Sequence, residues 1–466
     1  MVAKKNLCVL ILAGGKGTRM KSVTPKPLHT ICGGPILSHI LKTAQKLKPV
    51  AIGVLTGHQS ELLKQTVKDN LTNWGIKTPV EFLLQKELTG SGTAVKDSVA
   101  FIKKYDRVLI LAGDAPLVRG ETLKDLVKTH NKKQAACTVF TVNLNNPYGY
   151  GRIVKNSDGS FAKIVEQSEA DAKTAAIKEV NSGMYIFDCA PLIKMLALLK
   201  PQGVKKEYYL TDTLGFLKQK GFKVEVFNAP DFTEAMGINS KVQLAQAAAI
   251  MRERINNRLM DEGITFINPQ VTYIDPEVKI GTDTTVYPNC HIQGKTVIGS
   301  DCVIGPDCWI ENSKIEDGVT VKSGSYITDS VVRKNCQVGP YSRLRPAAEL
   351  KEGARVGNYV EIKKAVIGKG SKVSHLTYIG DTEMGANVNI GAGTITCNYD
   401  GKNKFKTVIG DNSFIGSNTN FVAPVKVGRG AKIGAGSTIT EDVPAEVLAI
   451  ARARQVNLNR KKENKK

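Results

Sequence analysis

The sequence predicts two domains of different fold class: an N-terminal α/β domain with a mostly parallel sheet, and a C-terminal domain of short strands stacked in a regular coil. Three observations lead to this prediction. The chain has 466 residues, more than one hydrophobic core usually holds. Its first half alternates apolar, β-rich runs with helical patterns. Its second half repeats an aliphatic residue every six positions.

The first half, from Leu7 to about Phe227, contains the apolar runs LCVLILA, VAIGVLT, VEFLL and RVLILAG. Between them lie the helical patterns PILSHILKTAQKL, SELLKQTVKDNL and the stretch from Ala94 to Lys103. Such alternation indicates βαβ units with helices on both faces of the sheet. Because ligands of these sheets bind beyond the carboxyl ends of the strands, we expect a site there.

A helical pattern over residues 240–263 separates the two halves and ends at Gly263. Either Asn239 or Ser240 is suited to cap this helix, so capping competes with any functional role of Asn239. We therefore expect an N-terminal domain over residues 1–239, a linker helix over 240–263, and a coil domain over 264–466 that ends in a basic tail.

The six-residue period begins near Ile274 and continues, with slips of one residue and one insertion, to Ile439. Repeats of this kind form a triangular coil in which each aliphatic residue points inward. The fourth residue after it is small, and four cysteines hold that position: Cys290, Cys302, Cys308 and Cys336. We interpret these cysteines as compact buried hydrophobes rather than redox groups.

The composition limits which classes of partner and which cellular compartment we expect. The formal net charge of +22 suits nucleic acid, a membrane surface or small anionic substrates, but no basic stripe is interleaved with aromatic residues, so we expect no nucleic-acid partner. No run approaches the roughly 18 apolar residues of a membrane span, so we expect no membrane partner. The nine cysteines lack metal-ligand spacing and predict a reduced, cytoplasmic protein. The cluster from Arg460 to Lys466 is typical of a solvated tail.

A glycine-rich segment, LAGGKGTRM at residues 12–20, follows the first predicted strand, and Pro25-Lys26-Pro27 comes shortly after it. Glycines let backbone amides approach a phosphate chain. Arg19 and Lys26 can neutralise charge on a transferring phosphoryl group. The dinucleotide-binding pattern G-x-G-x-x-G is absent, so the segment favours nucleotidyl transfer.

On these motifs the N-terminal half resembles the sugar-1-phosphate nucleotidyltransferases, which implies a Rossmann-like α/β domain. Over nearly its whole length the chain resembles the bifunctional family of UDP-N-acetylglucosamine pyrophosphorylases/glucosamine-1-phosphate N-acetyltransferases. By this resemblance Arg19 and Lys26 stabilise the transition state of uridylyl transfer, and Asp114 and Asn239 hold Mg²⁺. An isolated Asp114 at a strand end would otherwise be interpreted as a turn or cap residue. The resemblance assigns the nucleotide and the N-acetylated sugar to Leu12, Ala13, Gly14, Gly15, Lys26, Gln85, Gly90, Ser91, Ala112, Gly113, Asp114, Gly151, Glu166, Asn181 and Asn239.

The coil carries residues suited to acetyl transfer, which needs a base near the amine and positive groups for a phosphate. Residues at equal phase on successive coils lie about 5 Å apart, so distant positions converge. His375 lies just past the inward aliphatic position that Val373 holds in the repeat, so we expect it to point outward. A lone histidine there would be a polar surface residue, whereas the match of HLTYIGD to the family implies a catalytic base.

The repeats resemble the left-handed parallel β-helix of hexapeptide acyltransferases, which implies handedness and a homotrimer. The resemblance assigns glucosamine 1-phosphate to Arg345, Lys363, Tyr378, Asn389, Asn398 and Tyr399, the last two on the one large insertion of the coil. It assigns acetyl-CoA to a groove between subunits lined by Ala392, Ser417, Ala435 and Arg452.

The resemblance thus implies two reactions: acetylation of glucosamine 1-phosphate by acetyl-CoA, then transfer of UMP from UTP to N-acetylglucosamine 1-phosphate, which supplies a cell-wall precursor. Two alternatives stay open. A sugar-1-phosphate nucleotidyltransferase could carry a structural or regulatory β-helix, and translation-initiation exchange-factor subunits use this architecture to bind proteins. The sequence departs from the family's usual residues at Ser91, Thr93 and Ser168, and in residues 237–241 and 453–456.

Overall fold

The computed structural model describes residues 6–57, 59–201 and 206–458. The basic tail from Arg460 to Lys466 lies outside these described residues. The chain divides into two compact units, Met1–Ile250 and Met251–Lys466. The division falls within helix α9 (Lys241–Asp261). The expected division into 1–239, 240–263 and 264–466 stays a prediction.

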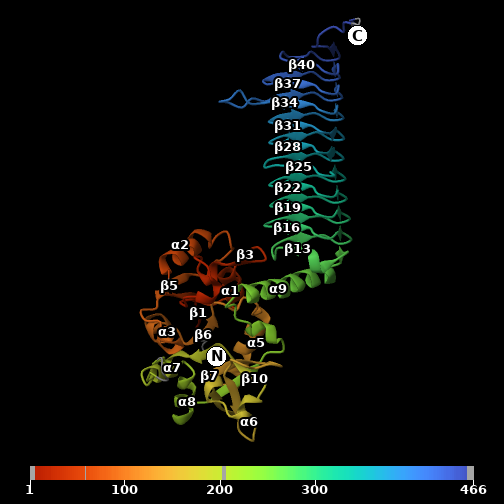
Figure 1. Cartoon of the computed structure of the whole chain (residues 1–466). Coiled ribbons are helices and arrows are strands. Elements are labelled where there is room, and N and C mark those ends of the chain that lie inside the picture. Colours follow the sequence, from red (N-terminus) through yellow and green to blue (C-terminus); the bar gives the residue numbers. More distant parts are fainter. Residues whose placement is uncertain (1–5, 58, 202–205, 459–466) are drawn as a thin grey trace, which may run out of the picture. The chain divides into compact units, whose positions relative to one another are not determined.

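The first unit is built on a nine-stranded sheet whose main path runs β11-β7-β10-β6-β1-β4-β5 (Figure 1). Strand β10 is antiparallel to β6 and β7, and the other pairs of this path are parallel. The strands are β1 (Leu7–Leu12), β4 (Ala51–Thr56), β5 (Val80–Leu84), β6 (Arg107–Ala112), β7 (Cys137–Asn143), β8 (Arg152–Lys155), β9 (Phe161–Val165), β10 (Glu179–Asp188) and β11 (Val224–Asn228). A small hairpin pairs β2 (Thr30–Ile31) with β3 (Gly34–Pro35).

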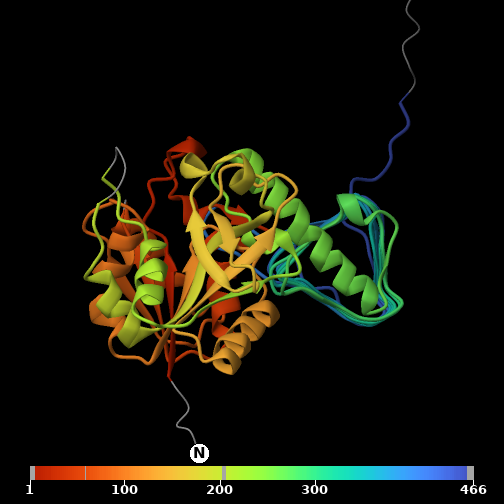
Figure 2. The same ribbon diagram turned by 90° about the horizontal axis from the view of Figure 1, so that it is seen from below.

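Helices cover both faces of this sheet, as the alternating pattern predicts (Figure 2). They are α1 (Ile36–Gln45), α2 (Ser60–Asn70), α3 (Ser91–Asp97), α4 (Val99–Ile102), α5 (Gly120–Lys133), α6 (Ala172–Ala175), α7 (Cys189–Leu196) and α8 (Asp212–Gln219), with the 3₁₀ turns η1 (Thr18–Met20) and η2 (Lys26–Leu28) before α1. The stretch from Ala94 to Lys103 is two short helices that break at Ser98, whose hydroxyl donates to the carbonyl of Ala94.

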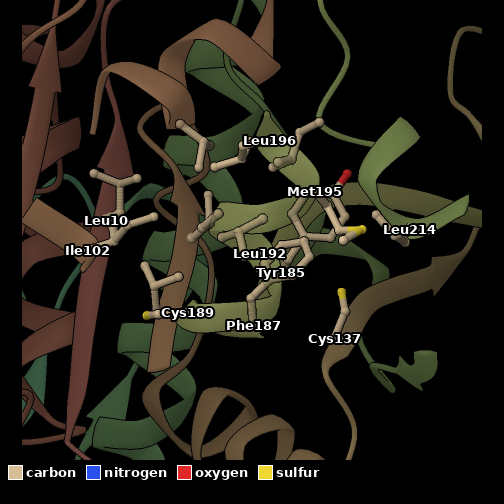
Figure 3. Close-up of a cluster of buried hydrophobic side chains, with 14 of the residues drawn as sticks. Leu10, Ile102, Cys137, Tyr185, Phe187, Cys189, Leu192, Met195, Leu196 and Leu214 are labelled. Atoms are coloured by element: carbon tan, nitrogen blue, oxygen red, sulfur yellow. The ribbon is translucent and has the colours of Figure 1, made fainter. Parts of the chain in front are cut away.

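The core of the first unit lies between the sheet and the helices α7 and α8. Leu10 of β1 and Tyr185 and Phe187 of β10 pack with side chains from these helices, among them Leu192 and Leu214 (Figure 3). Burial of such apolar side chains is the main favourable contribution to folding. Tyr185 is 3% exposed, so its hydroxyl needs a partner inside the protein.

Helix α9 begins with a side-chain cap. The backbone N–H of Gln243 donates to the Ser240 hydroxyl at 3.2 Å, and the N–H of Asn239 donates to the side chain of Gln243 at 2.7 Å. Ser240 is therefore the capping residue. The side-chain amide of Asn239 is therefore left for a contact other than capping.

The second unit is a coil of parallel strands in three sheets of eleven, ten and nine strands, and Figure 2 shows its triangular outline. From β12 to β37, each strand pairs with the third strand after it, one full turn along the chain, and β39 then pairs with β41. The first face runs from β12 (Thr265–Phe266) to β41 (Leu448–Ala449) and includes β27 (Arg355–Asn358), β30 (Lys372–His375) and β33 (Asn389–Ile390).

The second face runs from β13 (Tyr273–Ile274) to β40 (Thr438–Ile439) and includes β25 (Arg343–Leu344), β28 (Glu361–Lys363), β31 (Tyr378–Gly380) and β34 (Ile395–Cys397). The third face runs from β14 (Lys279–Ile280) to β38 (Val425–Val427).

The predicted phase of the coil is confirmed. The repeating aliphatic residues are buried, from Ile280 through Val373 to Ile439. The four cysteines at the small position are at most 1% exposed. His375, two residues beyond Val373, is exposed. Among the described residues, no helix is both long enough and apolar enough to cross a membrane.

Candidate active sites

The first candidate site lies at the carboxyl ends of β1 and β6, which are adjacent parallel strands that end in register at Leu12 and Ala112. The N–H of Gly113 donates to the carbonyl of Leu12 at 2.9 Å. A Cβ on Gly113 would stand 2.5 Å from that oxygen, so only glycine fits there. This pairing brings the two predicted segments, residues 12–15 and 112–114, to one edge of the sheet.

Lys26 joins this edge to the start of α9. Its ammonium donates to the Asp114 carboxylate at 2.5 Å and to the Asn239 amide oxygen at 3.1 Å. The Lys26 side chain is largely buried. The structure therefore brings together Lys26, Asp114 and Asn239, with a positive charge between two oxygen groups. Arg19 is exposed on η1 and forms no ion pair with a described residue.

The predicted uracil-side residues lie beside the glycine-rich segment. A Cβ on Gly14 would stand 2.6 Å from the side-chain oxygen of Gln85, so the two residues are packed against each other. Gly90 has a φ of +110°, and a Cβ there would stand 2.4 Å from the carbonyl of Tyr208. The Ser91 hydroxyl accepts from the N–H of Leu210 at 3.1 Å. The predicted residues are thus held by the segment around Tyr208.

The predicted sugar-side residues also converge. The N–H of Asn181 donates to the carbonyl of Gly151 at 2.8 Å. A Cβ on Gly151 would stand 3.3 Å from the Glu166 carboxylate. Burial raises the pKa of Glu166, and the charges of Glu169 and Asp212 raise it further. Glycine at 151 therefore leaves space directly beside a half-buried carboxylate.

Two tyrosines that the sequence analysis did not assign complete this region. The Asn181 amide donates to the Tyr185 hydroxyl at 2.7 Å, which satisfies that buried hydroxyl and orients the amide. Burial raises the pKa of Tyr150, and the charge of Asp114 raises it further. Tyr150 therefore lies within electrostatic range of Asp114.

The second candidate site lies in the coil, around the corner between β30 and β31. His375 ends β30 and pairs in register with Asn358 on the previous turn. The two side chains form a hydrogen bond of 2.7 Å between the Nδ1 of His375 and the Oδ1 of Asn358. An amide oxygen only accepts, so Nδ1 carries the proton and the Nε2 of a neutral ring is left as a base.

Positive charge gathers on the second face beside this corner. Arg345 donates to Glu361 at 2.7 Å. Lys363 faces Lys404 of the insertion, and this neighbour is the largest cause that lowers the pKa of Lys363; burial and Arg345 act in the same direction and Asp381 opposes them. Two ammonium groups held side by side favour a bound anion such as a phosphate.

The insertion is anchored through Asn398. Its amide donates to the Asp381 carboxylate in a short hydrogen bond, and its carbonyl accepts from the N–H of Phe405 at 2.9 Å. Tyr399 is 59% exposed. Tyr378 pairs in register with Glu361, and Asn389 lies outward on β33. The insertion projects from the coil beside β34 (Figure 1).

The four residues predicted for acetyl-CoA form a column on successive turns. The residue after Ser417, Asn418, donates its N–H to the carbonyl of Ala392 at 2.7 Å. In the same way Gly436, which follows Ala435, donates to the carbonyl of Ser417 at 2.8 Å. The guanidinium of Arg452 donates to the carbonyl of Ala435 at 2.6 Å. The column begins at the His375 corner, because the N–H of Gly393 donates to the carbonyl of His375.

The sequence analysis missed Asn358, Glu361, Asp381 and Lys404. The first three lie one turn before or after a predicted residue: Glu361 is 16 positions from Arg345, Asn358 is 17 from His375, and Asp381 is 17 from Asn398. Counting one turn along the coil from each predicted residue would have found these three. Lys404 lies in the insertion, where that count does not apply.

Comparisons with known proteins match each half of the chain. The family model described as nucleotidyl transferase matches residues 8–227. The model described as the GMPPB C-terminal domain matches residues 274–349, and the model described as bacterial transferase hexapeptide (six repeats) matches residues 406–441. The matches agree with the predicted fold class, a nucleotidyltransferase domain followed by a left-handed parallel β-helix.

Curated relatives cover nearly the whole chain. A protein of Shouchella clausii named "Bifunctional protein GlmU" is 45% identical over 96% of this chain and 97% of its own length. Proteins of the same name are 47% identical in Clostridium novyi, over 96% of both chains, and 46% identical in Clostridioides difficile, over 97% of this chain and 96% of that one. The chain therefore belongs to the family of bifunctional GlmU proteins.

Proposed function

We propose that this chain makes UDP-N-acetylglucosamine in two steps. In the coil, acetyl-CoA and glucosamine 1-phosphate form N-acetylglucosamine 1-phosphate and free coenzyme A. In the α/β unit, N-acetylglucosamine 1-phosphate and UTP form UDP-N-acetylglucosamine and diphosphate. The observation that supports the proposal is that each unit brings reactive groups together: Lys26 contacts Asp114 and Asn239 in one, and His375 contacts Asn358 in the other.

In acetyl transfer, the Nε2 of His375 accepts a proton from the sugar ammonium or from the attacking amine. The amine nitrogen then bonds to the thioester carbonyl carbon, and coenzyme A leaves as a thiolate that takes up a proton. Asn358 holds the proton on Nδ1, so the base is available at Nε2. Arg345, Lys363 and Lys404 bind the sugar phosphate, which relieves the repulsion between the two lysines.

In uridylyl transfer, a phosphate oxygen of N-acetylglucosamine 1-phosphate attacks the α-phosphorus of UTP, and diphosphate leaves. Arg19 and Lys26 offset the charge that develops on the α-phosphate. Glu166 and Asn181 bind the sugar, and Gln85, Gly90 and Ser91 bind uracil. Lys26 must then turn from Asp114 toward the phosphate, because in the structure its ammonium is paired with that carboxylate.

The residues around Lys26 suit a hard divalent cation. Asp114 and Asn239 direct two oxygen atoms at one cationic position, now filled by an ammonium, and oxygen ligands of this kind suit Mg²⁺. We propose that these two residues hold Mg²⁺ with the substrate phosphates. Bound there, the ion would offset phosphate charge and align the reacting groups.

We also propose a cytoplasmic homotrimer, in which acetyl-CoA binds along the column of Ala392, Ser417, Ala435 and Arg452 between subunits. The support is the resemblance to hexapeptide acyltransferases and the exposure of Ser417, Ala435 and Arg452. Sedimentation of the purified chain would test the trimer.

A single coupled assay tests the two activities. The purified chain receives glucosamine 1-phosphate, acetyl-CoA, UTP and Mg²⁺, and we expect free thiol, diphosphate and UDP-N-acetylglucosamine in equal amounts. Uridylyl transfer with supplied N-acetylglucosamine 1-phosphate but no consumption of acetyl-CoA would leave a nucleotidyltransferase with a structural coil. No turnover of either kind would favour a protein-binding role.

A further inference from the structure

His29 is a buried titratable residue that neither reaction above uses. It follows η2, the turn that carries Lys26, and is 9% exposed. The ammonium of Lys241, at the start of α9, lies 3.1 Å from the Nδ1 of His29. The contact therefore joins two segments more than 200 positions apart, which bear Lys26 on one side and Asn239 on the other.

The contact fixes the protonation of the ring. A lysine ammonium has donors only, so the Nδ1 of His29 accepts and the imidazole is neutral, with its proton on Nε2. Burial lowers the pKa of His29, the charge of Lys241 lowers it further, and a backbone hydrogen bond with Thr24 opposes them. His29 thus serves as a neutral hydrogen-bond acceptor for Lys241.

Further contacts join the same two segments, and residues farther along one segment contact residues farther along the other. Lys26 contacts Asn239 at 3.1 Å, and His29 contacts Lys241 two positions beyond Asn239. Farther along, the Cys32 thiol donates to the carbonyl of Ala248 at 3.5 Å. The stretch from Lys26 to Cys32 therefore lies against the first turns of α9.

Some of these contacts should break during the reaction, and others should persist. When Lys26 turns to the substrate phosphate, its bonds to Asp114 and Asn239 must break. The contact between His29 and Lys241 involves no proposed substrate or metal ligand, so it can persist. It lies three positions from Lys26 and two from Asn239, close enough to keep both at a fixed spacing.

We infer that His29 is a positioning residue for nucleotidyl transfer: by accepting from Lys241 it holds the Lys26 turn against the start of α9. This inference rests on the proposed uridylyl transfer. Misplacement of a reacting or charge-stabilising group by about 1 Å can cost roughly 100-fold in rate. Loss of the contact should therefore lower the rate of the chemical step more than the binding of UTP.

Three variants of the full chain test the inference: His29→Leu removes the acceptor, Lys241→Met removes the donor, and His29→Asn keeps an acceptor at the place of Nδ1. We expect His29→Leu and Lys241→Met to lower kcat for uridylyl transfer about 10- to 100-fold with little change in KM for UTP. His29→Asn should recover most of the rate. The double variant His29→Leu/Lys241→Met should be no slower than the slower single variant.

Acetyl transfer by the same preparations reports on the integrity of the fold, and Lys68→Met, an exposed lysine of α2, is the matched control for Lys241→Met. Equal losses in His29→Asn and His29→Leu would overturn the inference, as would an unchanged kcat in His29→Leu. Loss of acetyl transfer and of thermal stability in parallel would make His29 merely structural. A wild-type chain without uridylyl transfer would instead remove the proposed function itself.

Discussion

The two candidate sites are built in opposite ways. In the α/β unit, Lys26 contacts Asn239 across 213 positions of sequence. In the coil, His375 contacts Asn358 across 17 positions, one turn away. The first site depends on how loops fold over the end of a sheet, and the second depends on a register that repeats. Damage to one set of contacts should therefore leave the other site working.

The largest effect should come from the base of the coil site. We expect His375→Ala to lower acetyl transfer by about 100- to 10,000-fold, since a positioned base contributes on that scale. Uridylyl transfer from supplied N-acetylglucosamine 1-phosphate should be unchanged. Thiol release and diphosphate release measure the two activities separately, and equal loss of both would show that His375 supports the fold instead.

The matching change in the α/β unit is Arg19→Ala. Arg19 is exposed, so its loss should leave the fold intact while it removes charge stabilisation of the α-phosphate. We expect uridylyl transfer to fall about 100- to 1,000-fold, with acetyl transfer unchanged. Lys68→Ala, another exposed cation of the same unit, is the control. Wild-type diphosphate release in Arg19→Ala would exclude Arg19 from the site.

Asn358 tests the register of the coil. Asn358→Ala removes the acceptor that keeps the proton on Nδ1 of His375, so part of the ring population should present the wrong nitrogen. We expect kcat for acetyl transfer to fall about 10-fold, less than the loss in His375→Ala. KM for glucosamine 1-phosphate should change little. A larger rise in KM than fall in kcat would instead make Asn358 a substrate-binding residue.

These sites differ in how much the sequence predicts. The frame of inward aliphatic residues predicts that His375 faces outward, because it lies two positions past buried Val373 and outside the inward positions of the repeat. A count of one coil turn back from His375, 17 positions, also predicts Asn358 as its neighbour. No local pattern predicts that Lys26 meets Asn239, or that Tyr185 orients Asn181, because tertiary packing sets both contacts. In the α/β unit the motif after the first strand pointed to Lys26, whereas only the family resemblance identified Asn239 as a site residue.

A change of pH should affect substrate binding in the α/β unit less strongly than the substitutions above affect catalysis. Because burial raises the pKa of Glu166, this carboxylate gains a proton at a higher pH than an ordinary glutamate. We therefore expect KM for N-acetylglucosamine 1-phosphate to rise as the pH falls. The rise should begin at a higher pH than it would if Glu166 had the pKa of an ordinary glutamate. Glu166→Gln should have a higher KM that no longer depends on pH in this range. The same acid dependence in Glu166→Gln would assign the titration to another group.

The smallest effect should come from the coil's interior. Cys302 lies inside the stack, where its thiol lies against the carbonyl of Glu316, and burial raises its pKa. A protonated, enclosed thiol is inert, so an alkylating reagent should leave Cys302 unmodified in the native chain while it reacts with exposed Cys397. Cys302→Ala should cost about 1 kcal/mol of unfolding free energy, measured by denaturant titration, because alanine also fits the small position. Native alkylation of Cys302 would mean that the coil opens locally. The two units would then differ in rigidity as well as in the sequence separation of their site residues, because the repeating register would open where Cys302 lies.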